Sequence, residues 1–462
     1  EIRSRNFTSS ELTSQSEINS ELSNYDLYVK SGFSGASDGS ALNPFSDMQS
    51  AINAANDNDH IFVDGVFEIT QQITMPDDKS LSFYGVKDRT HIKYAAYSNT
   101  NGHIFSQPNT GCVKSYRFEN LELSNAGGYG VYIKSALKVV RINLDTHNCG
   151  WNGTRLSTTA PQTGDWASGG TLGYDSVKAD LQAFYASANA SSGGACRIEN
   201  ANILISIDND AYNNLRGERF QDCGVGGYGF VSRNNSYNNI DSGIYLASSS
   251  YNASNGCQNF TVYNNAAKNN ANNGFLCVGG INNVIALNQT ENNWSAGVMP
   301  WHVSNTVIRD NYLLNNNRSA FNGIGNDGDA LGSLYIAGDT INANAKFIVH
   351  AINNQIVSTG LGASTTKNGV FLHETLNDIN DRQKSIILLD NNTMQGQDYA
   401  LVEDCDLDEI RLIKGDNTFI DTAIKDVLKS GEGYYYELPF SNQHTNIKTA
   451  DFSLDASQTQ LI

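Results

Sequence analysis

Three consecutive stretches of the chain share one register, in which a short β-branched strand is closed by Asn or Asp. Asn264, Asn288 and Asp310 close these strands at intervals of 24 and 22 residues. A second polar position follows at Asn269, Asn293 and Asn315, and a Gly-led strand comes next at 274–277 and 297–299. A fixed period of this length is typical of a solenoid. Because each unit holds strands and turns without a helix, the repeat predicts an all-β fold, a single-stranded parallel β-helix.

The recurring Asn residues have a physical role in such a fold. Asn tolerates the left-handed backbone conformation that sharp turns between strands require. Coils stack about 4.8 Å apart, as strands in a sheet do, so an Asn at the same place in each coil can hydrogen-bond to the next. We therefore expect ladders of buried Asn side chains.

Composition limits the kind of partner. The chain has 462 residues, a net charge of −18 and 39% hydrophobic residues. The negative charge disfavours binding to nucleic acid and to anionic membranes, and no apolar run of 18 residues predicts membrane insertion. A neutral or weakly charged polymer is the easier partner. The 7 cysteines have no metal-binding spacing, which predicts free thiols and folding in a reducing cytosol.

The pattern divides the chain into four parts. Residues 1–24 have a loose helical pattern and are expected to form a stem or leader. Residues 25–60 predict a strand followed by a short amphipathic helix that caps the solenoid. Coils run from 61 to 430 and are interrupted by an insertion at 150–195, and 431–462 form a C-terminal cap or tail. Insertions in solenoids gather on one face, often the binding face.

One candidate site combines carboxylates with aromatic residues late in the solenoid. If Met299 and Leu372 occupy equivalent positions, the residues that follow them emerge at one edge of the rod. Two carboxyl groups beside an aromatic platform are what glycoside hydrolysis requires. The candidate catalytic residues are Asp327, Asp329 and Glu374, and the candidate substrate-binding residues are Trp301, His302 and His373.

A second candidate group lies near the insertion. Its catalytic candidates are Asp208 and Asp210, with Glu218 and Asp222 close by in sequence, and Trp166 and Tyr174 would line the groove. No motif for a nucleotide, a metal ion or another cofactor is present, so we expect neither a metal nor a cofactor.

The order of strand, Gly/Ser-rich turn, helix 48–55 and strand 61–69 resembles the entrance of right-handed parallel β-helix proteins of the pectin-lyase-like type. The leading stem, capped solenoid and unpaired cysteines together are most similar to bacteriophage tailspikes. That resemblance implies a homotrimer that binds and hydrolyses bacterial surface polysaccharide, O-antigen or capsule, through Asp and Glu. It also implies a location in the virion tail with action outside the cell.

Two alternatives remain open. A secreted polysaccharide lyase would act by β-elimination on a uronic-acid polymer. A non-enzymatic adhesin or fibre would bind glycans without cleaving them.

Overall fold

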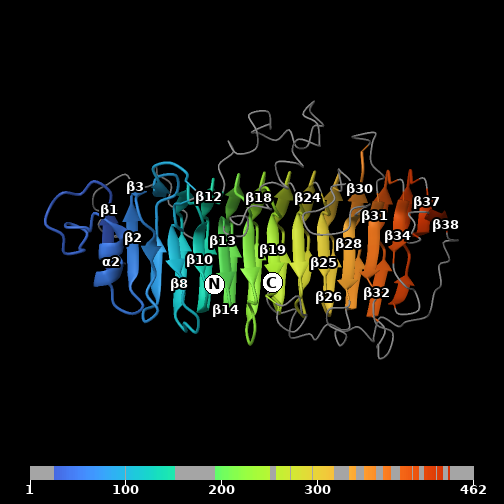
Figure 1. The fold of residues 1–462 in the computed structure, drawn as a ribbon, viewed down its shortest axis with the longest axis horizontal. Helices are drawn as coiled ribbons and strands as arrows, with labels where there is room; N and C mark the ends of the chain where they lie inside the picture. Colours follow the sequence, from blue (N-terminus) through green and yellow to red (C-terminus); the bar gives the residue numbers. More distant parts are fainter. Residues whose placement is uncertain are drawn as a thin grey trace.

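The backbone winds into a rod of stacked coils, each contributing one strand to each of three long sheets (Figure 1). The computed structural model describes residues 25–98, 100–150, 193–249, 256–270, 272–293, 295–316, 332–339, 348–359, 368–375, 385–397, 399–404, 410–422, 424–429 and 435–437. No helix in these ranges is long and apolar enough to cross a membrane.

Three sheets, A, B and C, are visited in turn by successive coils. Sheet A contains β1 (Leu27–Lys30), β2 (His60–Asp64), β5 (Leu81–Tyr84), β8 (Ser115–Glu119), β11 (Ala136–Ile142), β14 (Ala201–Ile207), β17 (Tyr228–Ser232), β20 (Phe260–Tyr263), β23 (Val284–Ala286), β26 (Thr306–Arg309), β29 (Ile348–Ile352), β32 (Ser385–Asp390) and β35 (Ile410–Lys414). Sheet B contains β3 (Val66–Ile69), β6 (His91–Tyr94), β9 (Glu122–Ser124), β12 (Asp145–His147), β15 (Asp210–Tyr212), β18 (Asn235–Tyr237), β21 (Ala266–Lys268), β24 (Gln289–Glu291), β27 (Tyr312–Leu314), β30 (Gln355–Val357), β33 (Thr393–Gln395) and β36 (Thr418–Ile420). Sheet C contains β4 (Ile73–Thr74), β7 (Phe105–Gln107), β10 (Tyr129–Ile133), β13 (Gly194–Glu199), β16 (Glu218–Gln221), β19 (Ile244–Ala247), β22 (Phe275–Val278), β25 (Val298–Trp301), β28 (Gly332–Asp339), β31 (Asn368–Thr375), β34 (Tyr399–Asp404), β37 (Ile424–Lys429) and β38 (Tyr435–Glu437).

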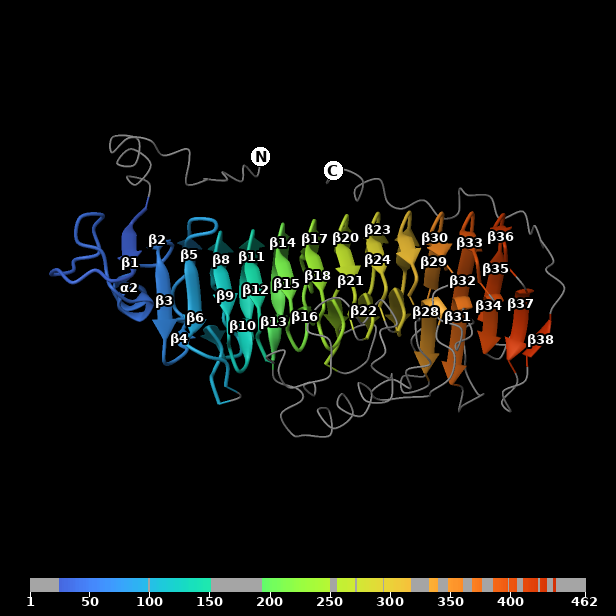
Figure 2. The same ribbon diagram turned by 90° about the horizontal axis from the view of Figure 1, so that it is seen from above.

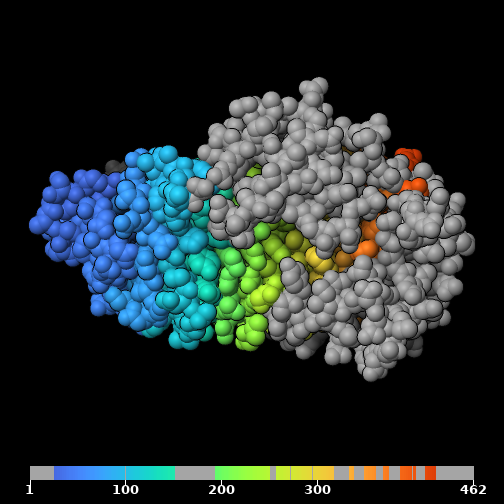
Figure 3. Space-filling model, in the orientation of Figure 1, coloured from blue at the N-terminus to red at the C-terminus, as the bar shows by residue number. Residues whose placement is uncertain are grey.

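Neighbouring strands of the three sheets run parallel, and coils succeed one another along the long axis from blue to red (Figures 2 and 3). The exception among the described strands is β38, which pairs antiparallel with β37 at the far end. The chain is therefore a right-handed parallel β-helix, and the predicted fold is confirmed.

The N-terminal end of the tube is closed by the helix α2 (Met48–Ala54), as the sequence predicted. Asp47 caps the helix by accepting a hydrogen bond from the Ser50 amide at 2.8 Å. The helix buries Met48, Ala51 and Ile52 in the same hydrophobic core as the first coils. A cap is needed because an open coil would expose unpaired backbone and apolar side chains.

Side chains alternate in direction along a strand. In each three-residue strand of sheet B, the central side chain therefore points into the tube and the two flanking side chains point outward. Leu123, Ala211 and Leu313 are central residues of this kind and are fully buried. The six described cysteines are also buried and free, which agrees with the expected thiols. The outward positions of sheet B are consequently open to polar and aromatic side chains.

Asn ladders run inside the tube along the turns on either side of sheet B. The Asn265 backbone N–H and its Nδ2 both donate to Asn288 Oδ1, at 2.9 and 3.0 Å, and Nδ2 also donates to the Val231 carbonyl. The first ladder contains Asn209, Asn234, Asn265, Asn288, Asn311, Asn354, Asn392 and Asn417. The second contains Asn214, Asn239, Asn270, Asn293 and Asn316.

The predicted ladders were correct in kind and wrong by one residue at four positions. Asn264, Asp310, Asn269 and Asn315 are not ladder members, and each immediately precedes one. These residues instead have the positive φ that the turn requires. Turn formation and ladder formation therefore fall on two adjacent residues, and the true period in this region is 23 residues.

Leu287 occupies the same turn position as Asn264 and Asp310. Its φ is 55°, and its side chain is 46% exposed. A left-handed conformation costs a residue with a Cβ about 1–2 kcal/mol, and Asn tolerates it better than other side chains. The coil is consequently strained at Leu287, with little apolar burial to offset the strain.

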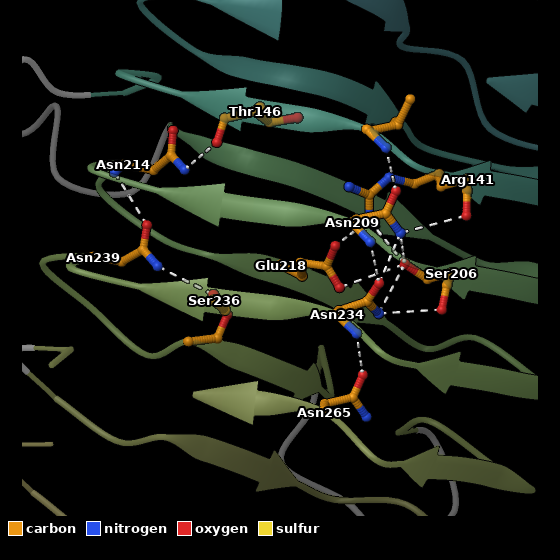
Figure 4. A network of polar contacts seen from close by, with 12 residues as sticks. Arg141, Thr146, Ser206, Asn209, Asn214, Glu218, Asn234, Ser236, Asn239 and Asn265 are labelled. Carbon is orange, nitrogen blue, oxygen red and sulfur yellow. Dashed lines mark hydrogen bonds and ion pairs between the residues drawn. The ribbon is translucent and has the colours of Figure 1, made fainter. Parts of the chain in front are cut away.

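A charged pair lies inside the tube beside the first ladder (Figure 4). Arg141 Nη1 is 2.9 Å from Glu218 Oε1, and both side chains are 0% exposed. Ser206 Oγ accepts from Arg141 Nη1 at 3.2 Å and is 3.4 Å from Glu218 Oε2. Burial raises the pKa of Glu218, and Arg141 opposes that rise. The pair joins sheets A and C across the interior.

We predict that Leu287→Asn raises the free energy of unfolding by about 0.5–1 kcal/mol, because Asn relieves the strain of positive φ. Equilibrium unfolding in guanidinium chloride measures the change. Leu287→Ala is the matched control, because it shortens the side chain and keeps the backbone strain. Equal stability of the Asn and Ala variants would contradict the explanation.

We predict that Glu218→Leu lowers the free energy of unfolding by about 3–5 kcal/mol, because it leaves the buried Arg141 charge unpaired. The double variant R141M/E218L should recover most of that loss, since it removes both charges together. Denaturant midpoints of the three proteins test this. A double variant as unstable as the single one would show that the pair is not the source of the effect.

Candidate functional site

Sheet B runs along the whole rod (Figure 2), and the strand register places two parallel rows of mostly polar and aromatic side chains on its outward face. Strand register aligns them, because residues paired across parallel strands project on the same side. The first row contains Glu122, Asp145, Asp210, Asn235, Ala266, Gln289 and Tyr312. The second contains Ser124, His147, Tyr212, Tyr237, Lys268 and Glu291.

The first row brings carboxyl groups together on successive coils. Asp145 is half-buried, and its Oδ1 is enclosed without a hydrogen-bond partner within the described part of the chain. Its Oδ2 accepts a long hydrogen bond of 3.5 Å from the Tyr212 hydroxyl. Burial raises the pKa of Asp145 to about 6, opposed by His147 and aided by Glu122 and Asp210. Desolvation also raises the pKa of Asp210, against a hydrogen bond from Asn235. One of these adjacent carboxyls can therefore hold a proton where a lone carboxyl would not.

The second row contains three stacked rings, which follow Ser124. The His147 and Tyr212 rings lie 5.0 Å apart at 13°, and Tyr212 and Tyr237 lie 5.0 Å apart at 7°. Burial, with Asp210 and Asp145, raises the pKa of Tyr237 to about 12. Because the rings cover one another's faces along the rod, they offer edges and hydroxyl groups to a ligand. The stack also fixes the ring orientations next to Asp145.

A groove continues the first row toward the C-terminal coils. Its volume is about 490 Å³, and its floor includes Asn235, Ala266 and Gln289. The wall is made of the turn residues between sheets A and B, and Tyr312 lines the C-terminal end of the groove, one coil before Gln355 in the same register. The wall residues are Arg233, Asn264, Leu287 and Asp310. Because the Ala266 side chain is smaller than those of its row neighbours Asn235 and Gln289, the groove is deeper at this position.

Three potential metal ligands meet at the N-terminal end of the rows. Glu122 Oε1 is 3.4 Å from His91 Nδ1 and 3.1 Å from His147 Nε2. The ligand atoms of these three residues all lie within 4.8 Å of one another. The sequence did not indicate this group, because its members come from β6, β9 and β12 and match no short motif.

The predicted group near the insertion is divided among separate places. Asp210 lies in the first row, as described above. Asp208 lies on the turn before it, paired with Arg233 at 2.7 Å. Glu218 points into the tube, and Asp222 accepts from the Ser249 amide beyond sheet C. Trp166 and Tyr174 fall outside the described residues.

The assumed register of the later site is wrong by one residue. Val298 pairs with Leu334, which pairs with Val370, so Leu372 corresponds to Pro300 and not to Met299. Trp301 and His373 therefore share a row on sheet C, two coils apart, with Ala337 between them.

Trp301 and its neighbour pack together in that part of sheet C. The buried His302 ring lies 5.3 Å from the Trp301 ring at 25°, and Trp301 also contacts the buried cluster that includes Tyr335 and Phe371. Glu374 is in β31, and the structure describes its backbone only. Asp327 and Asp329 lie outside the described residues. Their catalytic role stays a prediction.

Asp145, His147, Tyr212 and Glu122 were not among the predicted site residues. The signal that could have found Asp145 is the ladder, because the Leu144 amide donates to Asn209 and Asp145 thus precedes Asp210 by one coil. That coil contains the insertion, so the two ladder positions are 65 residues apart in sequence. The interrupted period concealed the equivalence.

Comparisons with solved structures find several matches, all at low similarity. The A-module of the Azotobacter vinelandii mannuronan C-5 epimerase AlgE6 is 14% identical, covers 82% of this chain and 93% of its own, and has a TM-score of 0.41. The Dettilon tailspike protein is 12% identical with coverage of 84% and 68% and a TM-score of 0.40. The catalytic domain of a GH87 alpha-1,3-glucanase is 11% identical with coverage of 90% and 68% and a TM-score of 0.45. No family model matches the chain, and no curated protein matches it significantly. The stacking of the three sheets, not these likenesses, establishes the fold.

Proposed function

We propose that the outward face of sheet B binds a polysaccharide along the rod and hydrolyses it, with Asp145 and Asp210 as the two catalytic carboxyls. The observation that carries the proposal is their position on adjacent coils, at the start of the groove lined by Asn235, Ala266 and Gln289. A glycosidase needs two carboxyls at the scissile bond and a surface that holds the sugars on either side. The first row contains the two carboxyls and, next along the rod, the groove residues that would hold the sugars.

The two carboxyls differ in exposure, since Asp145 is half-buried and Asp210 is exposed, and this difference supports different roles for them. Asp145, whose pKa burial raises to about 6, acts as the general acid that protonates the leaving oxygen. Asp210 is exposed and acts from the next coil on the sugar ring. Adjacent strands lie about 4.8 Å apart, so side chains that project from paired positions can bring their carboxyls to the separation of about 5–5.5 Å that retaining enzymes use. We therefore propose a covalent glycosyl intermediate on Asp210 and retention of configuration.

The groove is suited to uncharged sugars. Its lining is rich in amides that donate and accept hydrogen bonds, and Arg233 is already paired with Asp208. With a net charge of −18, the protein disfavours a highly anionic polymer. We propose bacterial surface polysaccharide, O-antigen or capsule, as the substrate class. A tailspike-like homotrimer acting outside the cell from a virion tail belongs to the same proposal.

A second activity, β-elimination on a uronic acid, is favoured by one feature of the second row. His147 stacks on Tyr212, whose hydroxyl contacts Asp145, so a base, a proton donor and a carboxyl with a raised pKa meet; in its protonated form that carboxyl can donate a hydrogen bond to the carboxylate of a uronic acid. Mass spectrometry of released fragments separates the two reactions. Hydrolysis adds one water per cut, and elimination adds none.

We predict that Asp145→Asn and Asp210→Asn each lower the rate of polysaccharide cleavage by 100-fold or more, because each removes a carboxyl required in the transition state. A panel of O-antigen and capsular polysaccharides is digested, and released fragments are quantified by mass spectrometry. Asp421→Asn is the matched control, since Asp421 is exposed and far along the rod.

Hydrolysis at the first row is supported if Asp145→Asn and Asp210→Asn both lose cleavage but still bind the polymer, while Asp421→Asn cleaves it at the wild-type rate. Full activity in both variants would overturn the assignment and return attention to Asp327, Asp329 and Glu374. A wild-type protein that binds a polymer without releasing fragments would support the adhesin.

We predict that Ala266→Tyr weakens polysaccharide binding at least tenfold, because the larger side chain fills the floor of the groove. Ala266 has an outward side chain, so the substitution requires no space in the core. Affinity electrophoresis against the cleaved polymer measures binding, and thermal unfolding verifies the fold. Unchanged affinity in a folded variant would show that the polymer does not follow the groove.

A further inference from the structure

We propose that His91, Glu122 and His147 bind a divalent transition-metal ion, with Zn²⁺ the favoured ion. The inference is independent of the proposed hydrolysis, since it depends only on these three side chains. Glu122 lies in the first row beside Asp145, and His147 lies in the second row one coil further along. The site would therefore border the N-terminal end of the carboxyl row.

Two of the three ligand separations already match a tetrahedral metal centre. Zn–N and Zn–O bonds of about 2.0–2.2 Å place ligand atoms roughly 3.3 Å apart. The Glu122 oxygen lies 3.4 Å from His91 Nδ1 and 3.1 Å from His147 Nε2. The imidazole rings are 6.1 Å apart at 43°, and they contact the same Glu122 oxygen from the two strands on either side of β9. A small side-chain movement brings the third separation into range.

Hydrogen bonds hold the outer edge of each imidazole. His91 Nε2 lies 2.8 Å from Ser124 Oγ, so a proton on Nε2 leaves the Nδ1 lone pair facing Glu122. His147 Nδ1 lies 3.0 Å from Nδ2 of the Asn148 side-chain amide. With that amide turned so that its oxygen accepts from Nδ1, the His147 Nε2 lone pair also faces Glu122. Metal-binding histidines characteristically have such partners on their second nitrogen.

The donor set selects the kind of ion. Two imidazoles and one carboxylate suit Zn²⁺ and related transition metals, whereas Ca²⁺ and Mg²⁺ prefer oxygen ligands. The three side chains are 16–34% exposed, so solvent or a substrate oxygen can occupy a fourth position. The nearby positive charge of Lys93, which lies on the same strand as His91, is paired with Glu68 at 3.5 Å. A bound ion would hold a hydroxyl or carboxylate of a sugar next to Asp145.

The test measures zinc directly. The full chain is dialysed against chelator and titrated with Zn²⁺ by calorimetry, and its thermal midpoint is followed at rising zinc concentration. We expect one Zn²⁺ per chain and a midpoint that rises with zinc, since an ion that binds the folded state stabilises it. His91→Gln and Glu122→Gln should each weaken binding at least tenfold. His60→Gln, on the exposed β2 histidine, is the matched control and should bind as wild type does.

X-ray absorption of the zinc complex identifies the ligands without relying on a variant that could misfold. Nitrogen and oxygen neighbours with imidazole scattering support the site. Sulfur neighbours would assign the zinc to cysteines and overturn the proposal. So would a folded wild-type chain that binds no zinc, or folded variants that bind as tightly as wild type. None of these results depends on whether the protein cleaves a polysaccharide.

Discussion

Hydrogen bonding between the buried Asn side chains of successive coils sets the geometry on which the rest of the structure depends. At every step of the two ladders an Asn oxygen accepts the backbone N–H of the preceding Asn, and at most steps it also accepts from that Asn's side-chain amide, as Asn288 Oδ1 does for Asn265. A buried amide left without partners costs about 1–3 kcal/mol, so a coil that slips out of register loses several bonds together. The ladders therefore hold both turns around sheet B at a constant position, coil after coil.

Constant turns make the outward face of sheet B regular, and that regularity assembles the candidate site. Asp145 and Asp210 are 65 residues apart in sequence and become Cα partners because the ladder aligns Leu144 with Asn209. Each sheet B strand has three or four residues, so it offers only two outward positions in most coils. The functional groups on this face are consequently arranged in rows along the rod. A linear polymer lies along rows of this kind more naturally than a compact ligand does.

Polar groups inside the tube and outside it have different consequences. Arg141 and Glu218 are enclosed, neutralise one another and join two sheets, so they serve the fold. Asp145, His147 and Glu122 carry similar groups on the outer surface, where solvent or a ligand can reach them. Glu218 was grouped with Asp210 in the sequence because they are close along the chain. Strand alternation separates them, since one faces the interior of sheet C and the other the exterior of sheet B.

The sequence by itself determined the coil, its period, the N-terminal helix cap and the presence of Asn ladders, because these depend on local patterns that recur. It named Asp210 as a candidate but not Asp145, which the structure pairs with it. Register decided the rest: a shift of one residue exchanges a turn Asn for a ladder Asn, as at Asn264 and Asn265. Only the tertiary structure placed Glu122, Asp145 and His147 beside one another, because stacking brings together residues whose separation varies with every insertion. Local sequence determines what a coil is, and stacking determines which side chains meet.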